Sequence, residues 1–145
     1  MNFDVVTLFP GMLQGPLDDG MLVRARRAGL LGVRVHDLRR FGTGPQRQVD
    51  DSPFGGGPGM VLKPEPFFEA VASLDEASRA GPIVLLSARG RRFSHRDAVR
   101  LSLGQRLTLL CGHYKDVDQR VADGLATEEI AVGDFVLSGG EPAAI

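Results

Sequence analysis

The sequence predicts an α/β domain, built as a parallel sheet with helices on both faces. Three short segments, Phe3–Phe9, Pro82–Gly90 and Arg106–Tyr114, are almost wholly apolar up to their last residues. Strands of this kind are typical of parallel sheets that are covered on both sides. Stretches with helical character alternate with them, as in βαβ units. The length of 145 residues suits one domain with a hydrophobic core.

The first half is predicted to run strand, helix, strand and then irregular chain. Its elements are a strand over Phe3–Phe9, a helix from Asp18 or Asp19 to Gly29, a strand over Gly32–Leu38 and an irregular stretch over Arg40–Gly59. Pro10 ends the first strand, and Gly29 is a typical residue after a helix. The irregular stretch is rich in glycine and proline, which disfavour both helix interiors and central strands.

The second half is predicted to continue the alternation. Its elements are a helix over Glu65–Gly81, a strand over Pro82–Gly90, a helix over Ser94–Leu103, a strand over Arg106–Tyr114, a short helix over Asp116–Leu125 and an extended segment over Glu128–Glu141. Ser94 and Asp97 have the spacing of a capping box, which marks the first turn of a helix.

Composition and charge exclude several classes of protein. No run approaches the roughly 20 apolar residues of a membrane helix, and the N-terminus lacks the pattern of a secretory signal. Cys111 is alone, so an intrachain disulfide is impossible, and we expect a cytoplasmic protein. The net charge of −1 gives no overall basic field for nucleic acid. The arginines at 24–27 and 39–40 suit phosphates, but a GC-rich genome explains the same bias.

Three segments end in small, polar or glycine residues, in LLSARG, LLCGHY and VLSGGE. Ligands of open α/β sheets bind beyond the carboxyl ends of the strands. Bare backbone there can offer N–H and C=O groups to an adenine edge or a carboxylate. Because loops of any α/β protein contain glycine, a small-molecule pocket and ordinary turns both remain open on this evidence.

The stretch DDSPFGGGPGM, Asp50–Met60, is the most unusual segment, with four glycines and two prolines. It is not a Walker loop, because Met60 and Val61 stand where lysine and a hydroxyl residue are required. The missing lysine and hydroxyl residue disfavour a nucleotide hydrolase, and the segment also lacks the third glycine of a dinucleotide fingerprint. The remaining interpretations are a flexible surface loop or a shaped backbone wall that faces an uncharged group such as a base.

Other catalytic patterns are missing. The three histidines lack the spacing of a zinc site, and no G-x-S-x-G elbow is present. Cys111 lies two residues before His113, which would suit a thiol–imidazole pair. A lone cysteine within LTLLC is more often a buried small apolar residue, and we expect burial.

Five blocks occur in order along the chain: LFPGM, VDDSPFGGGPGM, LLSARGRRF, LLCGHYKDVDQRV and VGDFVLSGGE. Together they closely resemble the bacterial tRNA (guanine-N1)-methyltransferases of the SPOUT superfamily, and the resemblance extends from Met1 to Ile145. It implies an α/β methyltransferase domain with a deep trefoil knot, which 145 residues need not complete, and an obligate homodimer. It implies methyl transfer from S-adenosylmethionine to N1 of the guanosine just 3′ of the anticodon. The anticodon stem-loop of tRNA is the expected partner, and the family's C-terminal tRNA-binding domain is expected to lie outside this chain.

Site residues follow from the resemblance, position by position. The expected cofactor-binding residues are Leu86, Ser87, Ala88, Gly112, Tyr114, Val132, Gly133, Asp134, Phe135, Val136, Leu137, Gly139 and Gly140. The expected substrate-facing residues are Arg47, Asp50, Gly55, Gly57 and Gly59. Where the family usually reads R/H-Y-E-G, this chain has His113, Tyr114, Lys115 and Asp116. We do not expect Lys115 to be a direct ligand of a positively charged cofactor, and Asp116 is the candidate to replace the lost acid.

The resemblance assigns no catalytic residue to this chain. The family's general base is an aspartate of the C-terminal segment, which is expected beyond Ile145. We therefore expect this chain alone to be inactive, and a fragment that only binds cofactor or RNA is the alternative. Family members also need Mg²⁺ for turnover, but no metal ligand can be named in this sequence.

Overall fold

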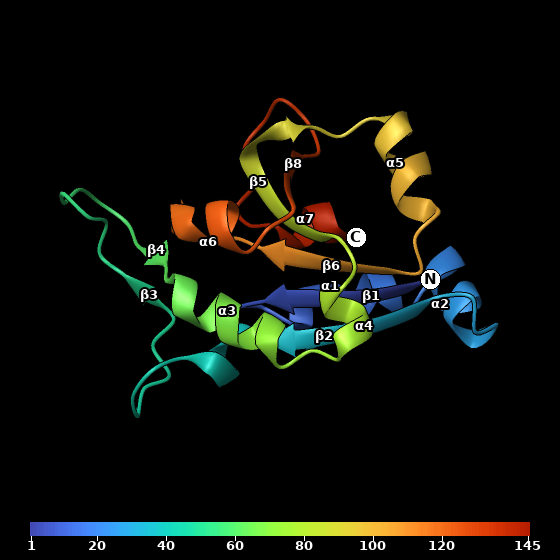
Figure 1. The fold of residues 1–145 in the computed structure, drawn as a ribbon, viewed down its shortest axis with the longest axis horizontal. Helices are drawn as coiled ribbons and strands as arrows, with labels where there is room; N and C mark the ends of the chain where they lie inside the picture. The colour runs from blue at the N-terminus through green and yellow to red at the C-terminus, as the bar shows by residue number, and fades with distance from the viewer.

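The computed structural model describes residues 1–145 and contains two sheets. The larger has five strands in the order β2-β1-β6-β5-β8, and all of its pairings are parallel (Figure 1). Its strands are β1 (Asn2–Thr7), β2 (Gly32–Asp37), β5 (Ile83–Arg92), β6 (Arg106–Cys111) and β8 (Glu128–Ala131). The predicted parallel α/β architecture is confirmed.

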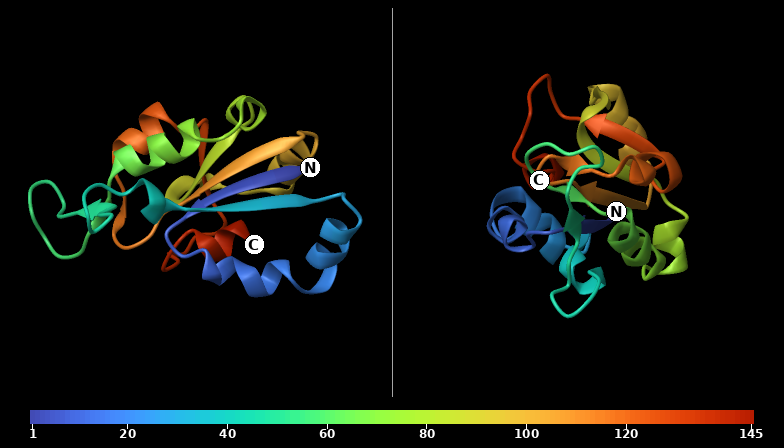
Figure 2. Two further views of the ribbon diagram at one scale, coloured as in Figure 1. Left: turned by 90° about the horizontal axis from the view of Figure 1, so that it is seen from below. Right: turned by 90° about the vertical axis from the view of Figure 1, so that its left-hand side faces the viewer.

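Helices cover both faces of this sheet (Figure 2). They are α1 (Gly11–Leu17), α2 (Gly20–Arg27), α3 (Pro64–Ala72), α4 (Glu76–Arg79), α5 (His95–Ser102), α6 (Gln119–Gly124) and α7 (Glu141–Ala144). Neighbouring strand residues supply the two cores, because side chains alternate across a strand. Val6 packs in the core with Phe67 of α3, whereas Val5 packs in the core with Leu13 of α1.

Two helical predictions need correction. The single helix predicted over Glu65–Gly81 is wrong, because α3 ends before Ser73 and α4 begins after Asp75. The Asp75 side chain accepts a hydrogen bond from the Ser78 backbone N–H, so it caps a second helix. Helix α1 was not predicted, because Pro16 lies inside it. The helices expected near Asp18–Gly29 and Ser94–Leu103 are present as α2 and α5.

Strand boundaries also differ near the carboxyl ends. β6 ends at Cys111, short of the predicted Tyr114, and β5 pairs irregularly with β8 between Leu86 and Arg91. The short helix predicted from Asp116 begins only at Gln119, because the preceding pair forms strand β7 (Asp116–Val117). The predicted extended segment contains β8, an irregular stretch and the first residue of α7. All of these shifts leave loops at one edge of the sheet.

The glycine-rich segment forms an arm that projects from the body of the molecule (Figure 1). Its base is the small sheet, in which β3 (Asp50–Asp51) pairs antiparallel with β4 (Val61–Leu62), and β4 pairs with β7. The φ angles of Gly55, Gly56, Gly57 and Gly59 lie between 83° and 107°, a region that favours glycine. The prediction of irregular chain over Arg40–Gly59 therefore holds, apart from β3 and the end of the 3₁₀ turn η1 (Leu38–Phe41).

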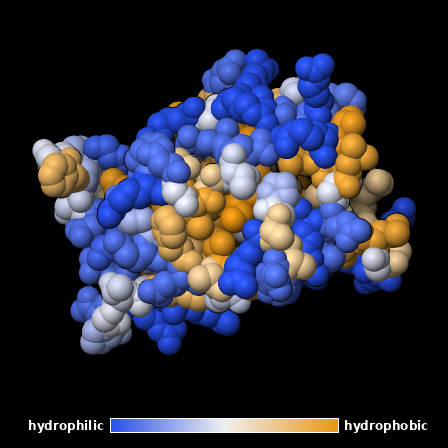
Figure 3. All heavy atoms as spheres, in the orientation of Figure 1, coloured by the Kyte–Doolittle hydropathy of each residue, from blue (hydrophilic) through white to orange (hydrophobic).

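The surface is mostly hydrophilic. In the orientation of Figure 1, apolar side chains reach the surface near the middle of the face, and hydrophilic side chains surround them (Figure 3). None of the helices has both the length and the apolar character that crossing a membrane requires.

Candidate functional site

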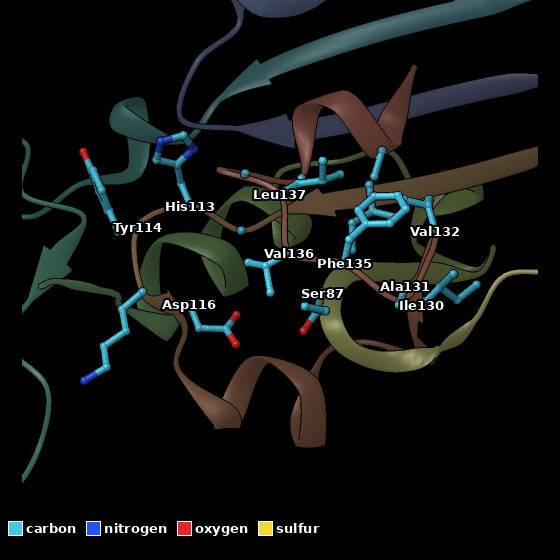
Figure 4. Close-up of a pocket in the computed structure, with 17 residues that line it drawn as sticks. Ser87, His113, Tyr114, Asp116, Ile130, Ala131, Val132, Phe135, Val136 and Leu137 are labelled. Carbon is cyan, nitrogen blue, oxygen red and sulfur yellow. The ribbon is translucent and has the colours of Figure 1, made fainter.

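A pocket lies beside the irregular part of β5, near Leu86–Ala88, and at the carboxyl ends of β6 and β8 (Figure 4). Together with the solvent at its open mouth, it encloses a space of about 590 Å³. It is lined by Leu86, Ser87, Ala88, Gly112, His113, Tyr114, Lys115, Asp116, Ile130, Ala131, Val132, Phe135, Val136, Leu137, Gly139, Gly140 and Ala143. The three segments singled out in the sequence therefore meet at one place.

Most of the expected cofactor-binding residues line this pocket. The exceptions are Gly133 and Asp134, which line a second hollow that shares Ala88, Ala131, Phe135 and Val136 with the first. Sequence reasoning missed four lining residues: His113, Ile130, Ala131 and Ala143. His113 lies within the quoted block LLCGHYKDVDQRV, and Ile130 and Ala131 directly precede VGDFVLSGGE, whereas no sequence signal indicated Ala143 of α7.

Close backbone packing shapes one wall of the pocket. The N–H of Gly140 donates to the carbonyl of Gly112 over 2.8 Å, and His113 forms an isolated β-bridge with Gly139. A Cβ on Gly140 would lie 2.7 Å from the Cα of Cys111, so only glycine fits there. Tyr114 has a φ of 62°, an uncommon conformation for a residue with a side chain. The wall is therefore formed largely by backbone that two loops hold together.

Asp116 supplies the one carboxylate among the lining residues. Its oxygens accept a hydrogen bond from the Val117 N–H at 2.8 Å and lie 3.0 Å from the Arg89 Nε. Figure 4 shows its carboxylate and the Ser87 hydroxyl on facing sides of the pocket. The site therefore presents one anionic group beside backbone and apolar side chains.

The side chain of Lys115 extends toward the glycine arm. A Cβ on Gly57 would lie 3.6 Å from the Lys115 Nζ, and a Cβ on Gly59 would lie 3.6 Å from the Lys115 Cβ. The backbone N–H of Lys115 also donates to the carbonyl of Met60 over 3.0 Å. These contacts join the arm to the rim of the pocket.

The expected substrate-facing residues all lie outside the pocket lining. Gly57 and Gly59 adjoin the pocket residue Lys115, as described above. Asp50 lies at the base of the arm, where it pairs with Leu62, and Arg47 adopts a positive φ of 49° in the turn before β3. The structure thus brings the arm's glycines to the rim, and no contact joins Arg47 to it.

Cys111 is fully buried beneath the pocket. Desolvation and, to a smaller extent, the nearby negative charge of Glu141 raise the pKa of this thiol far above its usual range. A thiol that stays protonated is a poor nucleophile. The expectation that Cys111 is buried is confirmed.

The carboxylates of this chain do not form a magnesium site. No group of three or more His, Cys, Asp or Glu side chains is arranged to hold a metal ion, and Asp116 stands alone at the pocket. Mg²⁺ usually takes oxygen ligands in octahedral geometry. We therefore derive no step through this ion.

Comparisons with known proteins agree on one family. Residues 1–145 match the family described as tRNA (Guanine-1)-methyltransferase TrmD. A protein named tRNA (guanine-N(1)-)-methyltransferase from Chloroflexus aggregans is 47% identical over the whole chain, and one from Geobacillus kaustophilus is 43% identical. A third, from Koribacter versatilis, is 48% identical over 97% of the chain. The chain spans 57% of the Chloroflexus protein and 59% of the Geobacillus protein.

Proposed function

This chain belongs to the tRNA (guanine-1)-methyltransferase family, and from that premise we propose that it forms the part of such an enzyme that binds S-adenosylmethionine. The proposed reaction transfers the methyl group of that cofactor to N1 of the guanosine just 3′ of the anticodon. The observation that carries the proposal is the meeting of three separate segments around one pocket: the irregular part of β5 at Ser87 and the loops at Gly112 and Gly139.

The pocket has the character that an adenosine requires. Ile130, Val132 and Phe135 provide apolar surface for a purine ring, while the loops at Gly112 and Gly140 bring backbone close to the cavity. Backbone N–H and C=O groups can pair with the edge of adenine, and this pairing does not depend on side-chain charge. These features support a nucleoside ligand over a free phosphate or a metal.

The methyl group on a sulfonium is already activated, so the protein contributes mainly alignment. We propose that the three segments hold the cofactor while Asp116 faces its positive charge. N1 of guanine carries a proton that a base must remove before it can act as a nucleophile. We assign that base to no residue of this chain, since Asp116 is engaged by Arg89 and by its own loop.

The glycine arm is the proposed contact for RNA. Phe54, at its tip, is fully exposed, and the arm adjoins the Lys115 ammonium group. Anticodon loops present unstacked bases, which proteins read by stacking on aromatic rings and by hydrogen bonds to base edges. An exposed aromatic ring, a chain of bare peptide groups and one cation suit that task.

We further propose that the active form is a homodimer, as the family resemblance implies. Phe135 and Val136 are 58% and 83% exposed in the loop after β8. Apolar side chains clustered in this way suit coverage by a ligand or by a second copy. Analytical ultracentrifugation of the purified protein tests the proposal, and a monomer at micromolar concentration would overturn it.

The second candidate function is binding without chemistry. It is favoured by the lack of an assignable base in this chain, whose one carboxylate at the pocket is paired with Arg89. Methyl transfer by these 145 residues alone would exclude it.

Calorimetry with S-adenosylhomocysteine tests the cofactor pocket, and methyl transfer to tRNA tests the reaction. We expect binding by the wild type and strongly reduced binding after Ala88→Phe, which fills the pocket. Ala28→Phe, on exposed helix-end surface, is the matched control. For the full-length enzyme, we expect transfer to tRNA with guanosine 3′ of the anticodon and none when adenosine replaces it. Absence of any binding would overturn the proposed function.

A further inference from the structure

Three residues that are far apart in the sequence meet beneath the pocket. Thr7 ends β1, His113 follows β6, and Glu141 begins α7. Glu141 is fully buried, and its Oε1 accepts a hydrogen bond of 2.6 Å from the Thr7 hydroxyl. A buried carboxylate is costly unless its oxygens are satisfied, so the partner of its second oxygen matters.

The donors and acceptors around the Thr7 hydroxyl can be assigned. The backbone N–H of Phe9 donates to the Thr7 Oγ1 over 2.9 Å, so the Thr7 hydroxyl proton is free to point at Glu141. The Oε1 of Glu141 is therefore an acceptor. Its Oε2 and the Nδ1 of His113 have no hydrogen-bond partner, are both buried, and lie 3.5 Å apart. Gly139 closes one side of this gap, where a Cβ would collide with both atoms.

One proton between the Glu141 Oε2 and the His113 Nδ1 would give both of these buried atoms a hydrogen-bond partner. Two facing lone pairs would repel each other and leave two buried acceptors unsatisfied. Imidazole is a stronger base than a carboxylate, so the proton belongs on Nδ1. The ring is also held by Phe9, at a centroid distance of 4.5 Å, and by an edge contact with Tyr114 at 5.0 Å. Nε2 is then the ring nitrogen without a proton, on a residue that lines the pocket.

We propose that Glu141 is a positioning residue that fixes His113 as the Nδ1–H tautomer. His113 thereby presents Nε2 to the pocket as a hydrogen-bond acceptor for an O–H or N–H group in the nucleoside part of the ligand. This step rests on the proposed function of the pocket, whereas the tautomer is a property of the protein alone. Neither composition nor spacing in the sequence indicates it, because Thr7 and Glu141 are 134 positions apart.

Nitrogen NMR of the imidazole rings tests the tautomer directly. The sequence has three histidines, and His36 and His95 are identified by substitution. In the purified protein at about pH 8.5, where a free imidazole is neutral, we expect His113 to carry its proton on Nδ1. In Glu141→Gln the amide oxygen takes the Thr7 proton and the amide N–H faces Nδ1, so we expect the Nε2–H tautomer. An Nε2–H tautomer in the wild type would overturn the proposal.

Ligand binding tests the acceptor. His113→Phe keeps an aromatic ring between Phe9 and Tyr114 but removes Nε2, and we expect about 10-fold weaker binding of both S-adenosylhomocysteine and methylthioadenosine. Glu141→Gln should weaken both to a similar degree. The control His95→Phe, on exposed α5, should leave both unchanged. Unchanged affinities in His113→Phe, or a loss confined to S-adenosylhomocysteine, would contradict an acceptor for the nucleoside.

The design separates folding from function. If Glu141→Gln does not fold, the wild-type spectrum and the His113→Phe affinities still decide the proposal. If the wild type binds no S-adenosylhomocysteine, the proposed function fails, while the wild-type spectrum still reports the tautomer.

Discussion

The Nε of Arg89 lies 3.0 Å from a carboxylate oxygen of Asp116, at the rim of the pocket. A second nitrogen of the same guanidinium donates to the Gln119 side chain over 2.9 Å, so Arg89 joins the end of β5 to the start of α6. This arrangement fixes the one carboxylate that lines the pocket. It keeps an acid at the pocket next to the cation of Lys115.

Replacing Asp116 should discriminate between the methyl donor and its product. S-adenosylmethionine carries a sulfonium charge that S-adenosylhomocysteine lacks, and a nearby carboxylate attracts that charge. We expect Asp116→Asn to weaken binding of the donor about 5- to 10-fold, the effect of roughly 1 kcal/mol, and binding of the product less than about 2-fold. Calorimetry with both ligands measures the ratio.

Glu69→Gln, which alters an exposed carboxylate on α3, is the control for that ratio. Equal losses for the two ligands in Asp116→Asn would show that Asp116 does not face the sulfonium.

Lys115 should contribute to the binding of tRNA. Because its ammonium group lies beside the glycine arm, Lys115→Ala should weaken tRNA binding about 3- to 10-fold and leave S-adenosylhomocysteine binding unchanged. The salt dependence of tRNA binding should become shallower by about one counterion. Filter binding across a salt series measures both quantities. A loss of cofactor affinity with intact tRNA binding would show that Lys115 contributes to cofactor binding and not to tRNA binding.

Substitution by alanine should affect stability very differently at different glycines of the chain. Gly140→Ala brings a Cβ against the Cys111 backbone, so we expect about 1 to 3 kcal/mol of lost stability, as for other overpacked sites. Gly11→Ala, in the first turn of α1 with nothing near its Cβ, should instead be neutral or stabilising by up to about 1 kcal/mol. Chemical denaturation of both variants provides the comparison. A Gly140→Ala protein as stable as the wild type would show that the two loops are not closely packed.

Acid should weaken the link between α5 and the sheet. Hydrogen bonds from Ser94, and then from Arg91, hold the pKa of Asp97 at about 2, below its usual value. A carboxyl group whose pKa is lowered on folding stabilises the folded state above the unfolded pKa, near pH 4, and loses that effect as the pH falls toward about 2. The difference in unfolding free energy between wild type and Asp97→Asn should therefore shrink between about pH 5 and pH 2. Glu69→Gln, on the exposed side of α3, is the control for removal of a surface carboxylate, and a difference for Asp97→Asn that does not change with pH would contradict the prediction.

Local sequence patterns predicted the parts of the fold that depend on neighbouring residues. The apolar strands and the Ser94–Asp97 capping box are present because burial on both faces and the first turn of a helix are determined locally. The break between α3 and α4 was missed, because apolar residues continue across it and only the Asp75 side chain marks the new helix. Helix α1 was also missed, because proline normally indicates the end of a helix, whereas Pro16 lies inside α1.

The candidate site was predictable in its backbone but not in its polar contacts. Glycine and small residues at Ser87, Gly112 and Gly139 indicated the strand ends, and parallel strands bring such ends to one edge. The pairs Arg89–Asp116 and Thr7–Glu141 join side chains across the fold, so no local spacing could reveal them. The roles of Gly133 and Asp134 in binding remain predictions, since these residues line the adjoining hollow.

The central claim is that three separate segments, at Ser87, Gly112 and Gly139, form a single site for an adenosine-containing cofactor. Hydrogen–deuterium exchange of the purified protein, with and without S-adenosylhomocysteine, tests it most directly. We predict that the ligand slows exchange together in residues 86–88, 112–116 and 132–140, while α2 and the glycine arm are unaffected. Protection confined to one of these segments, or protection elsewhere in the chain, would contradict the account.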